Sequence, residues 1–334
     1  MRDVARSAGV SLKTVSRVIN GEAAVAPATA ARVADAITEL GFERNDLARS
    51  LRPGQSSGTL GLVIEDAGNP FYSVVAQAVE DAARLRGLLL ITASAREDPT
   101  REYELVTALL RRRVDALLVV PIGSDHRYLL RNGDHVSTVF LDRPPQEIEA
   151  DTVLADNRAG AQRATEHLLA GGHERIALLG DDPGLYTARE RVAGYRAALE
   201  AAGVADPGLV RMGNHDASAA EAAVAALLEM DADERPTAIL AANNRNTVGA
   251  VRALAGVPDR IALVGFDDFE LADVLGITVM RSDPALMGLR AAELAFARLD
   301  GDERAAQQVT IPTELVVRGS GEVPLGAPPG APRP

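Results

Sequence analysis

The stretch DVARSAGVSLKTVSRVIN, residues 3–20, decides how the beginning of this chain folds. Its apolar residues recur at helical spacing in two short runs, which predict helices over residues 3–8 and 11–20. Gly9 between them is the residue type most tolerant of the left-handed conformation that ends a helix, and Ser11 is a type that caps the next one. Helix, glycine turn, helix is the helix-turn-helix layout, which places its second helix in the major groove of DNA.

The chain continues with a third helix and a linker. Pro27 suits the first turn of that helix, and Gly41 ends it. The run NDLARSLR, residues 45–52, predicts one further helix capped by Asn45, but eight residues are too few for a helix to be stable alone in water. The run PGQSSG, residues 53–58, is typical of a flexible linker.

The composition is that of a soluble globular protein with two or three domains. Of the 334 residues, 47% are hydrophobic and 25% are charged. No apolar run is long enough to span a membrane, and the first residues lack the apolar segment of a signal peptide. There is no cysteine, which excludes disulfides, thiolate metal sites and cysteine nucleophiles. We expect a cytoplasmic protein that does not associate with membranes.

The charge is unevenly spread along the chain. The formal net charge is −12, yet residues 1–54 hold eight basic and six acidic side chains, a net charge of +2, which leaves −14 for the remainder. A mildly basic head on an acidic body is compatible with binding to phosphate groups, but the charge alone is weak support for it.

From Thr59 onward, apolar strands alternate with helical stretches. We expect strands at 60–64, 88–92, 116–120, 138–141, 176–180, 238–242 and 261–266. We expect helices near 70–86, 100–113, 158–170, 188–202, 217–230 and 245–255. Continuous apolar strands that alternate with helices indicate parallel sheets covered on both faces. Two such series predict an α/β sensor of two doubly wound lobes, with a cleft at the carboxyl ends of the strands.

Several fragments together resemble one protein family. The stretch 3–20 resembles the head of the LacI–GalR family of bacterial repressors, and IEDAGNPFY (64–72) resembles the start of that family's sensor domain. Further matching fragments are VFLDR (139–143), ADNRAGAQRATEHLLAGGHERIALLG (155–180), RVAGYRAAL (191–199), VGFDD (264–268) and PTELVVRGS (312–320). Their order and spacing extend the resemblance over roughly residues 1–320.

The resemblance implies a periplasmic-binding-protein-like sensor and a domain order. It implies a DNA-binding domain over 1–44, a hinge helix and linker over 45–58, and a two-lobed effector-binding domain over 59–318. The chain would cross between lobes near residues 156, 282 and 312. Lobe 1 would comprise about 59–155 and 283–311, and lobe 2 about 156–282 and 312–318. The rest, 319–334, is rich in proline and glycine, and we expect a disordered tail.

The resemblance also implies a transcriptional regulator, most simply a repressor, that acts as a homodimer on a pseudo-palindromic operator. Leu12, Lys13 and Arg17 match the family's base-reading positions; Lys13 and Arg17 can donate to guanine, and Leu12 offers an apolar contact. Other head residues would donate to phosphates: Ser11, Thr14, Ser16 and Asn20.

The run 45–52 matches the family's hinge helix. Leu51 would wedge between base pairs in the minor groove beside Ala48 and Arg52, with Asn45 as the cap. A helix too short to persist alone can form when DNA and a dimer mate support it, which supplies a switch. The alternative is that Leu51 is a linker residue that packs on the body.

Three positions depart from the family pattern. Met1 begins almost inside the first helix, so we expect the natural start codon to lie upstream. Ala26 stands where a capping serine is usual, at a cost of about 1 kcal/mol of helix stability. Arg44 replaces a proline before the hinge.

The resemblance also marks a ligand pocket. The matching positions are Asp66, Phe71, Tyr72, Asp142, Thr187, Arg191, His215, Asn243 and Asp267. Carboxylates and an asparagine can hold vicinal hydroxyls, a guanidinium can bind two oxygens, and an aromatic ring can cover an apolar sugar face. This chemistry suits a sugar, a polyol or a nucleoside.

Other interpretations of these residues remain open. Asp66 and Asp267 follow strands, where an acid often caps the next helix, Arg191 could pair on the surface, and Phe71 could be core. His215 stands where the family commonly has a stacking aromatic. Asn244 replaces a usual aspartate, and Arg245 adjoins it, which leaves an anionic effector possible.

Two other classes of protein compete with a regulator. An enzyme would need a catalytic motif, but there is no GxSxG or GxxxxGK run, the five histidines lack metal-ligand spacing, and no cofactor signature is present. A periplasmic sugar receptor would share the two lobes, but the helix-turn-helix head and the lack of a signal peptide argue against it. Activation instead of repression, and co-repression instead of induction, remain open.

Overall fold

The structure, a computed structural model, describes residues 1–19, 25–42, 56–132, 136–257 and 261–325. The chain forms two compact units, Met1–Ser57 and Gly58–Pro334, which we call the head and the body. The expected hinge helix at 45–52 lies outside the described residues.

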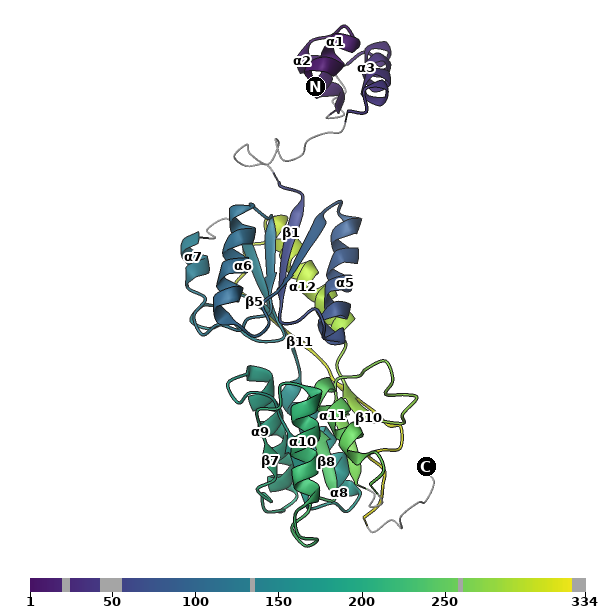
Figure 1. Ribbon diagram of the computed structural model, residues 1–334. Helices are drawn as coiled ribbons and strands as arrows, with labels where there is room; N and C mark the ends of the chain where they lie inside the picture. Colours follow the sequence, from purple (N-terminus) through teal and green to yellow (C-terminus); the bar gives the residue numbers. More distant parts are fainter. Residues whose placement is uncertain (20–24, 43–55, 133–135, 258–260, 326–334) are drawn as a thin grey trace. The chain divides into compact units, whose positions relative to one another are not determined.

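The described part of the head holds three helices around a small core (Figure 1). They are α1 (Arg2–Ser7), α2 (Leu12–Ile19) and α3 (Pro27–Glu39). Val4, Val15 and Val33, one from each helix, are buried together. Gly9 has a φ of 60°, so the turn between α1 and α2 uses the left-handed conformation that glycine tolerates.

The first lobe of the body is a parallel sheet with helices on both faces (Figure 1). Its strand order is β11-β5-β4-β3-β1-β2. The strands are β1 (Thr59–Ile64), β2 (Leu89–Ser94), β3 (Ala116–Val119), β4 (Ser137–Leu141), β5 (Asp151–Ala155) and β11 (Gln308–Ile311). Helices α5 (Pro70–Leu85) and α12 (Pro284–Leu299) pack on one face, and α6 (Pro99–Arg111) and α7 (Tyr128–Asn132) on the other.

The second lobe repeats this architecture. Its strand order is β12-β10-β9-β8-β6-β7, with only the β10–β12 pair antiparallel among the described pairs. The strands are β6 (Ile176–Leu179), β7 (Val210–Arg211), β8 (Ala238–Ala241), β9 (Ala262–Phe266), β10 (Thr278–Arg281) and β12 (Glu314–Val316). Helices α8 (Asn157–Ala170) and α9 (Tyr186–Ala201) cover one face, and α10 (Ala217–Leu228) and α11 (Asn244–Leu254) the other. The expected fold class, a helical head and two parallel-sheet lobes, is confirmed.

The chain passes between the two lobes three times. It leaves lobe 1 after β5, returns after β10 to form α12 and β11, and ends in lobe 2 with β12. Both lobes therefore depend on segments that are distant in sequence.

The expectation of a disordered tail from residue 319 is wrong for residues 319–325. Val323 is 4% exposed in the core of lobe 2, and its carbonyl accepts a hydrogen bond from His173 Nε2 at 2.8 Å. Ser320 Oγ donates to the carbonyl of Leu263 at 2.6 Å. The high content of proline and glycine suggested disorder, but this segment packs against lobe 2. Residues 326–334 lie outside the described residues.

Among the described helices, none combines the length and the apolar character needed to cross a bilayer.

Candidate functional site

Helix α2 presents its polar side chains away from the head core. Val15 is fully buried on its inner side. The described residues expected to contact DNA are exposed or half-buried: Ser11, Leu12, Lys13, Thr14, Ser16 and Arg17. This side of the helix can therefore contact base edges and phosphates. The remaining expected contacts lie outside the described residues: Asn20, Asn45, Ala48, Leu51 and Arg52.

Local hydrogen bonds set the orientation of α2. Ser11 Oγ accepts from the backbone N–H of Thr14 at 3.1 Å, so Ser11 caps the helix as expected. The Arg32 guanidinium donates to the carbonyl of Ala8 and so ties α3 to the turn. Ala26, at the start of α3, makes no side-chain capping bond, as its residue type dictates.

A cavity lies between the two lobes, at the carboxyl ends of both sheets. It holds about 50 Å³ of space for water-sized molecules, below the usual range of about 300–1,000 Å³ for small-molecule sites, so a sugar-sized ligand requires the lobes or the lining side chains to move. Its lining residues are Glu65, Asn69, Phe71, Tyr72, Asp142 and Arg143 from lobe 1, and Asp181, Thr187, Ala188, Arg191, Ala242, Asn243, Asn244, Arg245 and Asp267 from lobe 2.

In each lobe, an aspartate with a positive φ angle directly follows a strand. Asp142 directly follows β4 and has a φ of 64°; Asp267 directly follows β9 and has a φ of 63°. A positive φ is uncommon outside glycine but is tolerated by aspartate. The left-handed residue turns the chain sharply at the strand end, and both carboxylates are buried in the cavity wall, at 5% and 7% exposure.

On the side of lobe 1, four polar side chains form one buried network. The Tyr72 hydroxyl donates to Glu65 Oε2 at 3.0 Å and lies 2.9 Å from Asp142 Oδ2. Arg143 donates from Nη2 to Glu65, and its Nε lies 3.6 Å from Asp142 Oδ2. Burial is the main reason why the pKa values of Glu65 and Asp142 are raised, although the Arg143 charge opposes it.

Arg143 has unused hydrogen-bonding capacity at this wall. Its side chain is buried, yet Nε and Nη1 have no hydrogen-bond partner among the described residues. A buried guanidinium with two nitrogen atoms that make no hydrogen bond destabilises the protein unless a ligand or solvent supplies acceptors. Burial would lower the pKa of Arg143, but the neighbouring carboxyl and tyrosine groups raise it, so the side chain stays cationic.

On the side of lobe 2, Arg191 is held in a single position. Its Nε donates to Asn157 Oδ1 at 2.8 Å, and Nη1 donates to the Ala242 carbonyl at 2.6 Å and to Asp267 Oδ2 at 3.2 Å. Its guanidinium carbon lies 3.8 Å above the centre of the Phe266 ring, a cation–π contact. Arg191 is thus a rigid part of the wall and not a surface ion-pair partner.

Two contacts join the lobes directly beside the cavity. Arg245 donates from Nη2 to Asp66 Oδ2, and Asn244 Nδ2 donates to Asn69 Oδ1 at 2.8 Å. The backbone N–H of Gly68 lowers the pKa of Asp66, and Arg245 adds to this. Arg245 is therefore already paired with a carboxylate, which weakens the case for an anionic ligand that its position in the sequence had left open.

Seven of the nine ligand positions expected from sequence line the cavity: Phe71, Tyr72, Asp142, Thr187, Arg191, Asn243 and Asp267. Asn243 also caps α11 and donates to Asp181 Oδ2 at 3.2 Å. Asp66 and His215 lie outside the lining. Phe71 lines the cavity and also packs against the core of lobe 1, so both interpretations of it hold.

Sequence reasoning missed Glu65, Asn69, Arg143 and Asp181. Each is a polar residue within five positions of the end of a predicted strand, and Arg143 lies inside the quoted fragment VFLDR. Polar residues at the carboxyl ends of parallel strands were the available signal for all four.

The comparisons with known proteins cover both units. Residues 1–45 match the family of bacterial regulatory proteins, lacI family, and residues 165–321 match the periplasmic binding protein-like domain. The chain is 33% identical over 329 residues to the ribose operon repressor of Escherichia coli, covering 96% of this chain and 99% of the relative.

Solved structures agree. The CelR–cellobiose complex is 32% identical with a TM-score of 0.70, covering 96% of this chain and 98% of that one. The Lac repressor dimer bound to operator and the anti-inducer ONPF is 27% identical with a TM-score of 0.85, again covering 96% and 98%. The chain is a DNA-binding transcriptional regulator. It belongs to the lacI family of bacterial regulatory proteins, whose matched members are regulators and not enzymes.

Proposed function

We propose that the chain is a cytoplasmic, homodimeric repressor without catalytic activity, whose affinity for a pseudo-palindromic operator changes when a neutral, hydroxyl-rich molecule such as a sugar, polyol or nucleoside binds between its lobes. The observation that carries the effector part is Arg143 in a wall of the cavity, whose Nε and Nη1 atoms have no hydrogen-bond partner in the described part of the chain. Hydroxyl oxygens of such a molecule would complete its hydrogen bonding.

The charges around the cavity favour a neutral ligand. The described lining holds four carboxylic side chains, Glu65, Asp142, Asp181 and Asp267, against three guanidinium groups, Arg143, Arg191 and Arg245. All three of these cations already contact carboxylates. A phosphate or carboxylate group would enter a site without excess positive charge.

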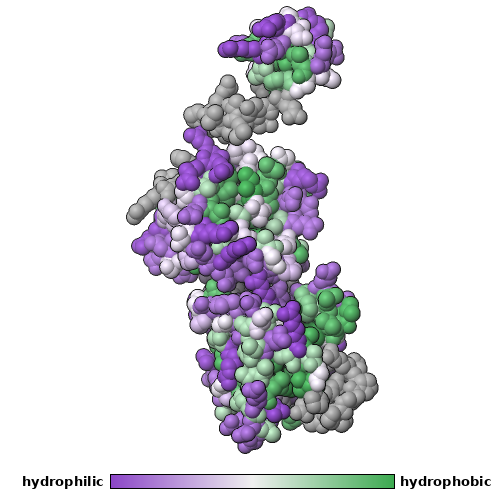
Figure 2. Space-filling view, viewed as in Figure 1, coloured by the Kyte–Doolittle hydropathy of each residue, from purple (hydrophilic) through white to green (hydrophobic). Residues whose placement is uncertain are grey.

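Exposed apolar residues support the dimer. On the face drawn in Figure 2, apolar residues gather on lobe 2 at the loop between β9 and β10, where Leu271 is 58% exposed and Val274 is 79% exposed. On lobe 1, Leu85 at the end of α5 is 84% exposed, and Leu89 at the edge strand β2 is 64% exposed. Burial of such exposed apolar side chains against a second subunit would be favourable, which supports a dimer.

DNA reading is tested first, by selecting sites from random duplex DNA with the full-length chain. We expect a two-fold symmetric motif. Arg17→Ala should relax the preference at one position of each half-site, at a cost of about 1–3 kcal/mol. Binding that is sensitive to salt and blind to sequence would contradict an operator-reading dimer.

The effector is tested by titrating D-ribose, cellobiose and fructose 1-phosphate, each with and without the selected operator. We expect a neutral sugar to bind and to change operator affinity, and Arg143→Gln to weaken sugar binding at least about tenfold while the DNA motif stays the same. Arg111→Gln, a change at an exposed arginine on α6, is the matched control. Binding of the phosphorylated sugar alone would contradict the neutral class.

A further inference from the structure

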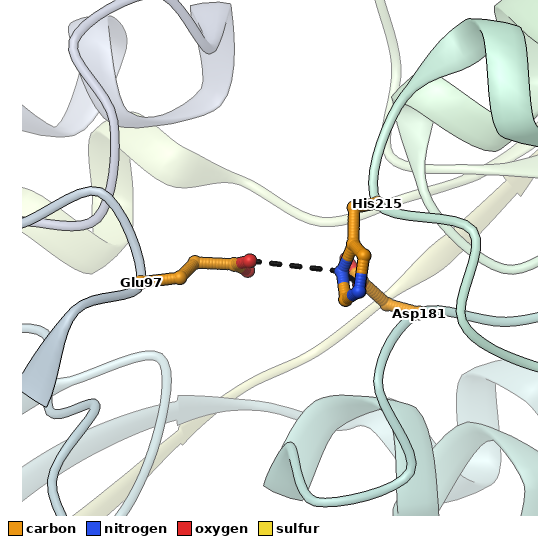
Figure 3. A group of neighbouring side chains, drawn as sticks. All are labelled: Glu97, Asp181 and His215. Carbon is orange, nitrogen blue, oxygen red and sulfur yellow. Dashed lines mark hydrogen bonds and ion pairs between the residues drawn. The ribbon is translucent and has the colours of Figure 1, made fainter.

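Three side chains meet at the edge of the cavity: Glu97, Asp181 and His215 (Figure 3). Asp181 lines the cavity, whereas Glu97 and His215 lie outside its lining. Glu97 follows β2 in lobe 1, whereas Asp181 follows β6 and His215 precedes α10, both in lobe 2. His215 Nδ1 lies 2.8 Å from Asp181 Oδ1 and 3.7 Å from Glu97 Oε2. The imidazole therefore stands between a carboxylate of its own lobe and a carboxylate of the other lobe.

The tautomer follows from the partners. An ionised carboxylate only accepts hydrogen bonds, so Nδ1 of His215 carries the proton that is donated to Asp181. Nε2 takes up or releases the second proton, which switches the ring between neutral and cationic forms near neutral pH.

The charged groups around His215 are predominantly acidic. From the surrounding segments they are Glu97 after β2, Asp181 and Asp182 after β6, Asp216 at the start of α10, Arg143 after β4 and Arg245 on α11. Arg143 is paired with Glu65 and Arg245 with Asp66. None of the remaining acids has a permanent cation of its own among these groups. The protonation state of His215 therefore determines the net charge of this group of side chains.

The pKa directions agree with this geometry. Burial would lower the pKa of His215, but the hydrogen bond to Asp181 and the charges of Asp181 and Glu97 raise it. Burial, and then the charge of Asp181, raise the pKa of Glu97. Both groups thus hold protons more tightly with the lobes closed than they would in water.

Opening the lobes would change these interactions selectively. The contact between His215 and Asp181 lies within lobe 2 and persists, whereas the Glu97 contacts cross the cleft and are lost. With a cationic His215, closure gains an attraction to Glu97. With a neutral His215, closure brings two carboxylates together, and only Arg143 and Arg245, which already pair with Glu65 and Asp66, offset the repulsion, so closure is opposed.

We propose that His215 is a proton-operated latch on lobe closure, in which the protonated ring draws Glu97 of lobe 1 onto lobe 2 and the neutral ring lets Glu97 and Asp181 repel one another. Its effect on operator binding rests on the proposed function; the response of the lobes to pH does not. Since closure and proton uptake are linked, acid favours the closed form, and this advantage disappears as the pH rises through the pKa of His215.

The test measures the distance between the lobes in the full-length, ligand-free protein. Because the chain has no cysteine, spin labels can be attached at two introduced sites, Glu104→Cys on α6 and Ala225→Cys on α10, both exposed. Double electron–electron resonance at pH 5.5–8.5, in EDTA and with excess unlabelled protein, reports the closed and open populations within one subunit.

We expect the ratio of closed to open molecules to fall about twofold to fivefold from pH 6 to pH 8, and the response to shrink in 0.5 M salt. His215→Gln should abolish the pH response. Glu97→Gln should also abolish it and, because it removes the repulsion, should give more closed molecules than wild type at pH 8. A purely structural role for Glu97 would instead open the lobes.

The matched control is His167→Gln, which changes a histidine of lobe 2 that contacts Glu322 and should keep the wild-type response. A full pH response in His215→Gln, or a more open Glu97→Gln protein at pH 8, would overturn the latch. If neither D-ribose nor cellobiose binds, yet the lobes respond to pH as expected, the effector proposal fails and the latch stands.

Discussion

At the residue scale, the cavity is built on two aspartates in left-handed backbone conformation, Asp142 and Asp267, one at a strand end of each lobe. The resemblance to a family identified both residues as expected ligand positions. The sequence alone did not show which side chains they bind. Asp267 accepts hydrogen bonds from Ser282 Oγ at 2.7 Å and from Arg191 at 3.2 Å, so it holds Arg191 in its place in the cavity wall.

Replacing Asp267 with Asn tests this role. Asn fits the left-handed backbone and keeps the shape of the side chain, but it removes the charge that faces Arg191. We expect the free energy of unfolding, measured with urea, to fall by about 1–3 kcal/mol, since Arg191 keeps the acceptors of Asn157 and Ala242. Asp267→Ala should cost more, because it also strains the backbone and leaves Ser282 unpaired. An Asn variant as stable as wild type would show that the charge pair contributes nothing.

At the element scale, α8 and α9 pack closely because of a single glycine. A Cβ added at Gly194 in α9 would stand 2.1 Å from the carbonyl oxygen of Arg158 in α8. Helical periodicity predicted both helices, but glycine in the middle of a helix is locally unfavourable. Only the packing partner explains why it is there.

Gly194→Ala separates local propensity from packing. Propensity alone would raise stability by about 1 kcal/mol, whereas the backbone clash should lower it by about 1–3 kcal/mol or more. We therefore expect a net loss of stability in thermal and urea unfolding. A more stable variant would mean that the two helices can separate at little cost.

At the scale of the whole molecule, the chain's own side chains join the two lobes. Arg245 and Asn244 of α11 reach Asp66 and Asn69 of lobe 1. Such contacts set how readily the lobes close, and hence what an effector must add.

Arg245→Ala should shift the lobes toward an open form. We expect a larger radius of gyration in small-angle scattering of the ligand-free protein. We also expect weaker binding of any sugar that the titrations identify as a ligand. Arg252→Ala, a change at an exposed arginine of the same helix, is the control and should leave both unchanged. An unchanged radius of gyration for Arg245→Ala would contradict a role for this pair in closure.

The sequence by itself determined the fold class and the helix-turn-helix head, and its resemblance to a family marked seven of the fifteen residues that line the cavity. The fold and the head are encoded locally, in the spacing of apolar residues and in capping and turn residues. The cavity positions were found in short stretches, mostly at the ends of predicted strands, that match the family. The head surface of α2 is one example, because Ser11 and the buried Val15 are visible in the sequence.

Only the tertiary structure decided which partners these residues meet. It paired Asp66 with Arg245, placed His215 beside Glu97, and packed Val323 into lobe 2. It also left two nitrogen atoms of Arg143 without a hydrogen-bond partner among the described residues. The physical reason is that burial, charge pairing and unsatisfied hydrogen bonds arise between segments far apart in the chain. They become defined only when two lobes, each assembled from separated segments, close on one another.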